Sequence, residues 1–210
     1  LGENHYIMTT TTGGAANVLG KLEDYLQTEW PELDVYLTSV TDHFATVSVC
    51  GPNSKKIVSE IIPDLDFSDE SFPHMSFKNT KIGKINCRVM RISFTGEQSY
   101  EINIQATYGK SVWEKCMEVG KDYNITPYGT ETMHLLRAEK GFIIVGQDTD
   151  ATMTPIDLQM DWIVSKKKYD FIGKRSLYRS DTIREDRKQL VGLLTEDPNE
   201  VLEEGAQIVA

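Results

Sequence analysis

The sequence predicts an α+β fold, with mostly antiparallel strands and helices packed on one side of them. Two kinds of pattern support this class. Short runs that are β-branched, or that alternate apolar and polar residues, predict strands, whereas longer segments with apolar residues three or four positions apart predict helices. Hydrophobic residues make up 40% of the 210 residues and charged residues 26%, which is typical of a globular chain.

Strand and helix signals alternate through the first part of the chain. The β-branched run at the start is ended by Gly13-Gly14, and Pro31 ends the helical pattern that follows it. The expected elements, in order, are a strand over 5–12, a helix over 15–30, strands over 35–39 and 44–50, a short helix that begins within 51–54, and an acidic surface loop over 63–73.

The second part of the chain continues the alternation with weaker signals after Pro155. The expected elements are strands over 84–93 and 99–104, helices over 108–120 and 130–141, a short helix over 173–178, and a strand over 189–195. A further strand pattern begins at 205–210 and stops with the chain, and no element precedes the first strand. We therefore expect a fragment of a longer polypeptide.

Charge and hydropathy argue against two classes of partner. The formal net charge of −10 disfavours non-specific binding to nucleic acid, which depends on Lys and Arg neutralising phosphates. No run approaches the roughly 18 apolar residues that cross a bilayer. Because the start of the chain also lacks the pattern of a signal peptide, we expect a cytoplasmic protein with no nucleic-acid or membrane partner.

The cysteines and histidines do not form a metal-binding pattern. Cys50, Cys87 and Cys116 are widely spaced, odd in number and contain no Cys-x-x-Cys pair. We interpret them as reduced, structural residues rather than as metal ligands or nucleophiles. The four histidines are equally scattered, and we expect no metal site.

Glu101 is the first candidate for a binding residue. Tyr100, Ile102 and Ile104 alternate with polar residues, which predicts a half-buried strand with Glu101 on its polar face. A fixed carboxylate accepts a pair of hydrogen bonds from a ring with adjacent N–H donors, and the neighbouring Tyr100 ring offers a surface beneath such a ligand. The alternative is an ordinary turn followed by an exposed strand glutamate.

Arg137 is the second candidate. On the helix expected over 130–141, Glu131, His134 and Arg137 are three residues apart and lie near one another along one stripe. The rigid guanidinium fork suits a carboxylate or the polar edge of a ring. The alternative is that Arg137 pairs with a neighbouring glutamate on a solvated face.

Four motifs in this order resemble the folate-binding aminomethyltransferase family, which includes the glycine-cleavage T-protein and the related C-terminal regions of sarcosine and dimethylglycine dehydrogenases and oxidases. The motifs are GPNSKK at 51–56, FTGE…YEI within 94–102, LRAEKG at 136–141 and KYDFIGKR at 168–175. Within the family, residues 6–13, 141–150 and 154–155 resemble most the C-terminal region of the α subunit of heterotetrameric sarcosine oxidase.

The resemblance implies a tetrahydrofolate site. Glu101 falls on the family glutamate that holds the ring nitrogens of the pterin, and Arg137 falls on an arginine that lines the same site. Phe94 stands where the T-protein branch commonly has a tyrosine, and Thr11 lies near an asparagine of that branch. With Tyr100, these residues form the expected folate-binding set.

The resemblance also indicates what this chain lacks. The family has a mechanistically important aspartate just before the strand expected at His5. Residues 1–4 contain no aspartate, and Glu3 is their only acidic residue. We therefore leave the catalytic residue unassigned, upstream of Leu1, and expect the fragment by itself to be inactive. Residues 1–152 are expected to form the folate-binding domain, and 153–210 a connecting segment and an incomplete C-terminal β-barrel.

The implied reaction is capture of a one-carbon unit. Oxidative demethylation of sarcosine gives an iminium, whose carbon passes to tetrahydrofolate as 5,10-methylenetetrahydrofolate while glycine is released. No Gly-x-Gly-x-x-Gly turn follows a strand, so FAD, FMN and NAD are expected elsewhere in the complex, with the other sarcosine oxidase subunits as partners. The alternatives are a glycine-cleavage aminomethyltransferase and a non-catalytic folate-binding module.

Overall fold

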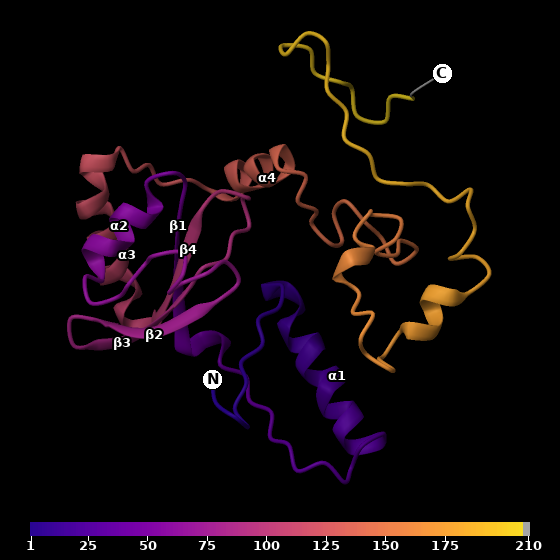
Figure 1. Cartoon of the computed structure of the whole chain (residues 1–210), viewed down its shortest axis with the longest axis horizontal. Coiled ribbons are helices and arrows are strands. Elements are labelled where there is room, and N and C mark those ends of the chain that lie inside the picture. Colours follow the sequence, from indigo (N-terminus) through magenta and orange to yellow (C-terminus); the bar gives the residue numbers. More distant parts are fainter. Residues whose placement is uncertain (208–210) are drawn as a thin grey trace. The chain divides into compact units, whose positions relative to one another are not determined.

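The computed structural model describes residues 1–207, apart from the side chain of Thr12. Its contacts divide the chain into two compact units, Leu1–Met133 and His134–Ala210, and each is described by itself. The α-helices are α1 (Ala15–Thr28), α2 (Ser54–Ile61), α3 (Gly109–Gly120) and α4 (Thr130–Glu139) (Figure 1). The short 3₁₀ helices are Thr12–Gly14, Thr41–His43, Ala106–Tyr108, Lys121–Tyr123, Asp161–Ile163 and Lys174–Tyr178.

The first unit is built on one antiparallel sheet. Its strands are β1 (Phe44–Cys50), β2 (Phe77–Ile82), β3 (Ile85–Met90) and β4 (Ser99–Gln105), in the spatial order β1-β4-β3-β2. Helices α2 and α3 lie together on one side of this sheet (Figure 1). We call the other side of the sheet the outer face. The α+β prediction, with antiparallel strands and packed helices, is confirmed for this unit.

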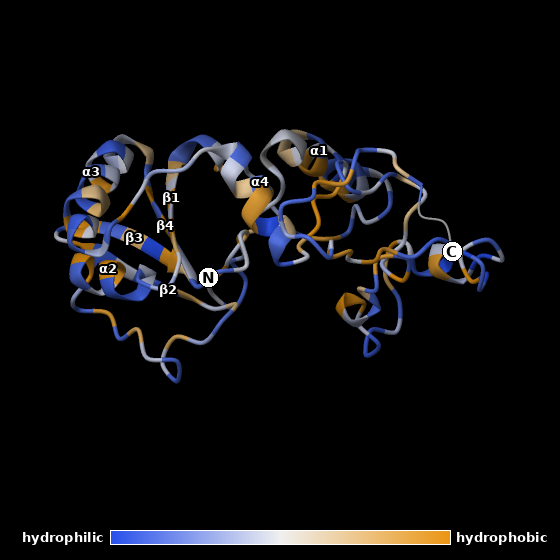
Figure 2. Cartoon of the chain, turned by 90° about the horizontal axis from the view of Figure 1, so that it is seen from above, coloured by the Kyte–Doolittle hydropathy of each residue, from blue (hydrophilic) through white to orange (hydrophobic). Residues whose placement is uncertain are grey.

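The core lies between the sheet and the two helices. Tyr100, Ile102 and Ile104 of β4 are fully buried, and Ile102 stands opposite Val47 of β1 and Val89 of β3. Helices α2 and α3 add apolar side chains to the same cluster: Ile57, Val58, Ile61, Val112 and Cys116. In Figure 2 both helices are divided into hydrophobic and hydrophilic sides, as expected for helices that cover a sheet.

The acidic loop predicted over 63–73 is irregular, but it is more than a surface connection. Phe67 and Phe72 are buried, and their rings pack against Tyr100 with centroid separations of 5.3 and 5.9 Å. Such tilted and edge-on contacts add to the stabilisation that burial gives. The sequence pattern missed this role because two isolated phenylalanines among acidic residues show no periodicity.

Three predicted strands are wrong. In the described part of the chain, no β-ladder is formed by residues 5–12, 35–39 or 189–195. The start of the chain contributes only an isolated bridge between Gly2 and His5. A β-branched run becomes a strand only if a neighbour pairs its backbone groups, and local composition does not supply that neighbour. The strand expected at 205–210 is not formed by 205–207, and 208–210 lie outside the described residues.

Strand β2 was missed for the opposite reason. It alternates exposed and half-buried residues, but Lys78, Asn79 and Lys81 leave it without an apolar face. Its existence depends on pairing with β3 across the tight turn at Gly83, which has a positive φ of 60°. Tertiary pairing therefore overrides the local sequence signal.

The second unit is mostly irregular and is tied by a buried ion pair. Arg187 donates to both carboxylate oxygens of Asp157 at 2.7 Å, and Thr154 adds hydrogen bonds to the same carboxylate. The hydrogen bonds from Arg187 hold the pKa of Asp157 far below its usual range. Among the described residues, none of the helices is long and apolar enough to cross a membrane.

Replacing Phe72 by alanine tests whether the 63–73 loop belongs to the core. We expect Phe72→Ala to lower the free energy of unfolding by about 3–5 kcal/mol, because it leaves a cavity beside Tyr100. Urea denaturation of Met75→Ala, an exposed residue just after this loop, is the control. Equal stability of the two variants would contradict the packing role of Phe72.

Replacing Asp157 by asparagine tests the ion pair of the second unit. We expect the variant to lose about tenfold or more of its backbone hydrogen-exchange protection near 152–187 at neutral pH, because Arg187 loses its buried partner. Since folding lowers the pKa of Asp157, the wild-type protection should be full above about pH 4 and should fall below it. The exposed Asp186→Asn variant is the control, and equal protection in both would contradict the role assigned to Asp157.

Candidate functional site

The candidate site is centred on Glu101, on the outer face of β4. Because Tyr100 and Ile102 are buried in the core, alternation along the strand directs Glu101 to the opposite side of the sheet. β4 is an inner strand, so Glu101 stands between Ser48 of β1 and Met90 of β3. The carboxylate is therefore flanked on two sides and half-buried.

The Glu101 carboxylate has unused hydrogen-bonding capacity. Among the described residues, no side chain or backbone N–H donates to it and no cation pairs with it. Burial raises the pKa of the Glu101 carboxyl above its ordinary value. A partly desolvated carboxylate without donors is energetically unfavourable, so a ligand that brings donors gains more than it would at an exposed glutamate.

Tyr128 belongs to the same unit as Glu101 and lies near enough for the charge of the Glu101 carboxylate to act on its phenol. The thiol of Cys50, at the end of β1, donates to the Tyr128 hydroxyl at 3.1 Å. Burial, this contact with Cys50 and the nearby charge of Glu101 raise the pKa of Tyr128 to about 12, although a side-chain hydrogen bond with Ser48 opposes the shift. The phenol is therefore protonated at neutral pH and remains a hydrogen-bond donor close to an acceptor-only carboxylate.

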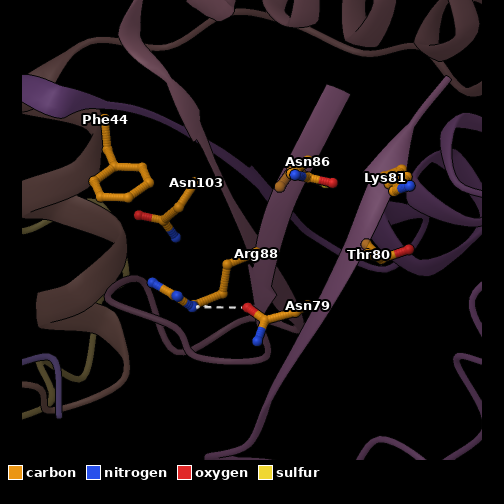
Figure 3. Close-up of a pocket in the computed structure, with 8 residues that line it drawn as sticks. Phe44, Asn79, Thr80, Lys81, Asn86, Arg88 and Asn103 are labelled. Atoms are coloured by element: carbon orange, nitrogen blue, oxygen red, sulfur yellow. Dashed lines mark hydrogen bonds between the residues drawn. The ribbon is translucent and has the colours of Figure 1, made fainter. Parts of the chain in front are cut away.

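The outer face continues from Glu101 into an open hollow of about 420 Å³. It is lined by Phe44, Asn79, Thr80, Lys81, Asn86, Cys87, Arg88 and Asn103. Figure 3 shows Arg88 and Asn103 projecting into this hollow, with the Arg88 Nε donating to Asn79 at 3.1 Å. Asn103 follows Glu101 by two positions on β4, so the hollow extends the same polar surface.

Tyr100 does not contact the face that carries Glu101. We expected its ring to lie beneath a flat ligand, but the ring is fully buried against Phe67 and Phe72. The structure corrects that expectation, because consecutive strand residues point to opposite sides of a sheet. Tyr100 instead fixes the position of β4, on which the orientation of Glu101 depends.

Phe94 and Thr11 lie in irregular segments of the first unit. Phe94 is exposed in the bend between β3 and β4, where its ring is open to a ligand. Thr11 is exposed just before the first 3₁₀ helix. These positions leave both residues available for binding.

Arg137 belongs to the second unit and is buried on α4. Its Nη1 donates to the Phe142 carbonyl at 3.0 Å and the guanidinium pairs with Asp148. Burial raises the pKa of Asp148, but hydrogen bonds from Arg137 and the Ile144 N–H outweigh it and leave that pKa below its usual value. The alternative of a solvated pair with a glutamate is thus wrong.

One donor of Arg137 remains unused. Its Nε is buried and has no acceptor among the described residues. A buried N–H without a partner is unfavourable, and the cost is removed if a ligand or another group supplies an acceptor. This orphan donor is compatible with the binding role expected for Arg137.

Sequence patterns did not single out Tyr128, Ser48 or Cys50 as part of the site. Ser48 and Cys50 are the polar positions of an alternating strand, a signal that places them on the outer face once β1 is paired with β4. Tyr128 lies in an irregular segment, and only the folded chain brings it to Cys50. The other two cysteines are buried in the core, where burial raises the pKa of each thiol to about 11.

Known proteins with similar sequences are longer than this chain. The α subunit of sarcosine oxidase from Corynebacterium sp. (strain P-1) is 56% identical over 211 residues, which cover all of this chain and 22% of that protein. The corresponding subunit from Rhizobium meliloti is 41% identical over the whole chain. An aminomethyltransferase from Thermoanaerobacter sp. (strain X514) is 33% identical over 70% of the chain and 39% of its own length. The chain thus spans about a fifth of the sarcosine oxidase subunits it matches.

A solved structure and a family match agree with these relatives. The glycine cleavage system aminomethyltransferase T from Bartonella henselae superposes with a TM-score of 0.55 over 74% of this chain and 39% of that one, at 20% identity, which supports the fold. The GCVT N-terminal domain family matches residues 1–168. The chain therefore belongs to the aminomethyltransferase (glycine-cleavage T-protein) family, within which it is similar to the sarcosine oxidase α subunit.

Proposed function

We propose that this chain is the tetrahydrofolate-binding part of a sarcosine oxidase α subunit. The observation that carries the proposal is the half-buried Glu101 carboxylate, which lacks a partner among the described residues and faces away from the core. Its two oxygens suit the adjacent ring N–H and amino donors of a pterin. The similarity of the whole chain to sarcosine oxidase α subunits supports the same assignment.

The donor and acceptor pattern of the outer face fits such a ring. Glu101 provides the acceptors, while Ser48 and Ser99, whose hydroxyls are 3.2 Å apart, give the adjoining surface a polar character. Phe94, Thr11 and Arg137 are the further folate-binding residues that we propose from the family resemblance. Tyr100 supports them by holding β4 in the core.

In the proposed reaction, the residues of this chain bind and orient. Bound tetrahydrofolate would supply the N5 and N10 nucleophiles that take the one-carbon unit from sarcosine-derived iminium as 5,10-methylenetetrahydrofolate. Glu101 would fix the far edge of the ring and so hold the reacting edge in one orientation, which is catalysis by positioning. We propose that the catalytic carboxylate, FAD, FMN and NAD belong to other parts of the complex, and that the protein is cytoplasmic.

A glycine-cleavage aminomethyltransferase is the second candidate. An aminomethyltransferase relative matches 70% of the chain at 33% identity, whereas a sarcosine oxidase α subunit matches the whole chain at 56%. The higher identity and coverage favour the sarcosine oxidase assignment. A non-catalytic folate-binding module would share the Glu101 site and differ only in lacking turnover.

Glu101→Gln tests the proposed site in the full-length polypeptide that carries this chain. We expect about 10- to 100-fold weaker tetrahydrofolate binding in anaerobic calorimetry, because one charged acceptor becomes a donor. Flavin reduction by sarcosine should be unchanged. Glu114→Gln, at an exposed position of α3, is the control. Equal folate affinity for the two variants and the wild type would refute the proposed function.

A further inference from the structure

The hollow on the outer face is positively charged. Of the eight residues that line it, Lys81 and Arg88 are cations and none is an aspartate or a glutamate. The chain as a whole carries a formal net charge of −10. A local excess of positive charge on an acidic protein attracts an anionic group to that place. The hollow is therefore a candidate site for an anion.

Arg88 is held in place and still has donors to offer. Its Nε donates to the Asn79 Oδ1 at 3.1 Å, and its Cζ lies 5.7 Å from the centre of the Phe77 ring. These two contacts with β2 orient the guanidinium group over the sheet. Among the described residues, no group accepts from its two Nη nitrogens and no carboxylate pairs with it. The planar Nη pair suits a carboxylate, which accepts two parallel hydrogen bonds.

The register of the sheet aligns these cations with Glu101. Glu101, Met90 and Phe77 stand in one row across β4, β3 and β2. Arg88 lies two residues from Met90, and Lys81 lies four residues from Phe77, in the same direction along the strands. At roughly 3.4 Å per residue, Arg88 is about 7 Å and Lys81 about 13 Å from the row of Glu101, measured along the strands. Because even numbers of residues separate them from this row, both belong to the outer face.

A reduced folate has the order of charges that this face accommodates. The ring donors that suit Glu101 are at one end of the molecule, and a glutamyl group with two carboxylates is at the other. The p-aminobenzoyl group separates the two ends. A ring bound at Glu101 can therefore extend its carboxylates along the strands to the cations of the hollow.

We propose that Arg88 and Lys81 form a carboxylate subsite, which binds the glutamyl end of the folate whose ring is held at Glu101. This inference rests on the proposed function, which places the ring there. Arg88 donates a pair of hydrogen bonds to one carboxylate, and Lys81 adds attraction at the exposed end of the hollow. The subsite raises the affinity for a folate that carries the glutamyl group above that for a pteroate that lacks it.

Arg88→Gln in the full-length polypeptide tests the proposal. Anaerobic calorimetry compares tetrahydrofolate with tetrahydropteroate, which lacks the glutamyl group, for the wild type, Arg88→Gln and Glu101→Gln. We expect Arg88→Gln to weaken tetrahydrofolate binding by about 5- to 20-fold and tetrahydropteroate binding by less than about twofold. The matched control is Lys84→Gln, because Lys84 is an exposed cation of the same hairpin that does not line the hollow.

The outcomes separate this inference from the proposed function. A lower ratio of the two affinities in Arg88→Gln, but not in Lys84→Gln, supports the subsite. If Glu101→Gln weakens both ligands while Arg88→Gln leaves the ratio unchanged, the subsite is overturned and the ring site stands. If Glu101→Gln changes neither affinity, the ring site fails and this inference with it.

Sarcosine and glycine also carry a carboxylate, so the titrations are repeated with saturating glycine. We expect glycine to leave the ratio of the two folate affinities unchanged in the wild type. If glycine lowers that ratio in the wild type but not in Arg88→Gln, the hollow takes the amino acid and its assignment to the glutamyl end is overturned.

A second variant keeps the test decisive if Arg88→Gln does not fold. Lys81→Glu changes an exposed residue and places a negative charge at the hollow. We expect it to weaken tetrahydrofolate binding by about threefold or more, through repulsion of the glutamyl carboxylates, and to leave tetrahydropteroate binding nearly unchanged. An unchanged ratio in folded Lys81→Glu would overturn the proposal.

Discussion

The structure of the first unit depends on the alternation along β4. Burial of Tyr100, Ile102 and Ile104 against α2, α3 and the 63–73 loop fixes which side of the strand faces the core. Because β4 is an inner strand, the same constraint holds Glu101 on the outer face between β1 and β3. A change of one residue in register would reverse both faces. The packing of the core and the orientation of the Glu101 carboxylate are thus set by the same strand alternation.

This arrangement leaves polar groups that the fold does not satisfy. Among the described residues, nothing donates to the Glu101 carboxylate, and in the second unit the buried Arg137 Nε lacks an acceptor. Proteins usually pair such groups, since leaving them unpaired is unfavourable. A ligand that brings adjacent donors would compensate Glu101. That is the physical basis for the folate ring that we propose on this face.

Sequence patterns predicted the parts of the fold that local periodicity determines. Local periodicity predicted helices α1, α2, α3 and α4 and strands β1, β3 and β4. It also predicted the outward position of Glu101. Three features were not predicted, because each depends on contacts with another segment of the chain. They are strand β2, the buried Phe67 and Phe72, and the contact between Cys50 and Tyr128. The domain boundary at 152 and the C-terminal barrel remain predictions.

The measurement that tests this account most directly is a ¹³C NMR titration of the Glu101 carboxyl carbon, assigned with Glu101→Gln, with and without tetrahydrofolate. We predict that the pKa of free Glu101 lies above that of exposed glutamates, because burial disfavours the charged carboxylate. Bound folate should lower that pKa, because paired donors favour the charged form. An ordinary pKa that folate leaves unchanged would contradict the account.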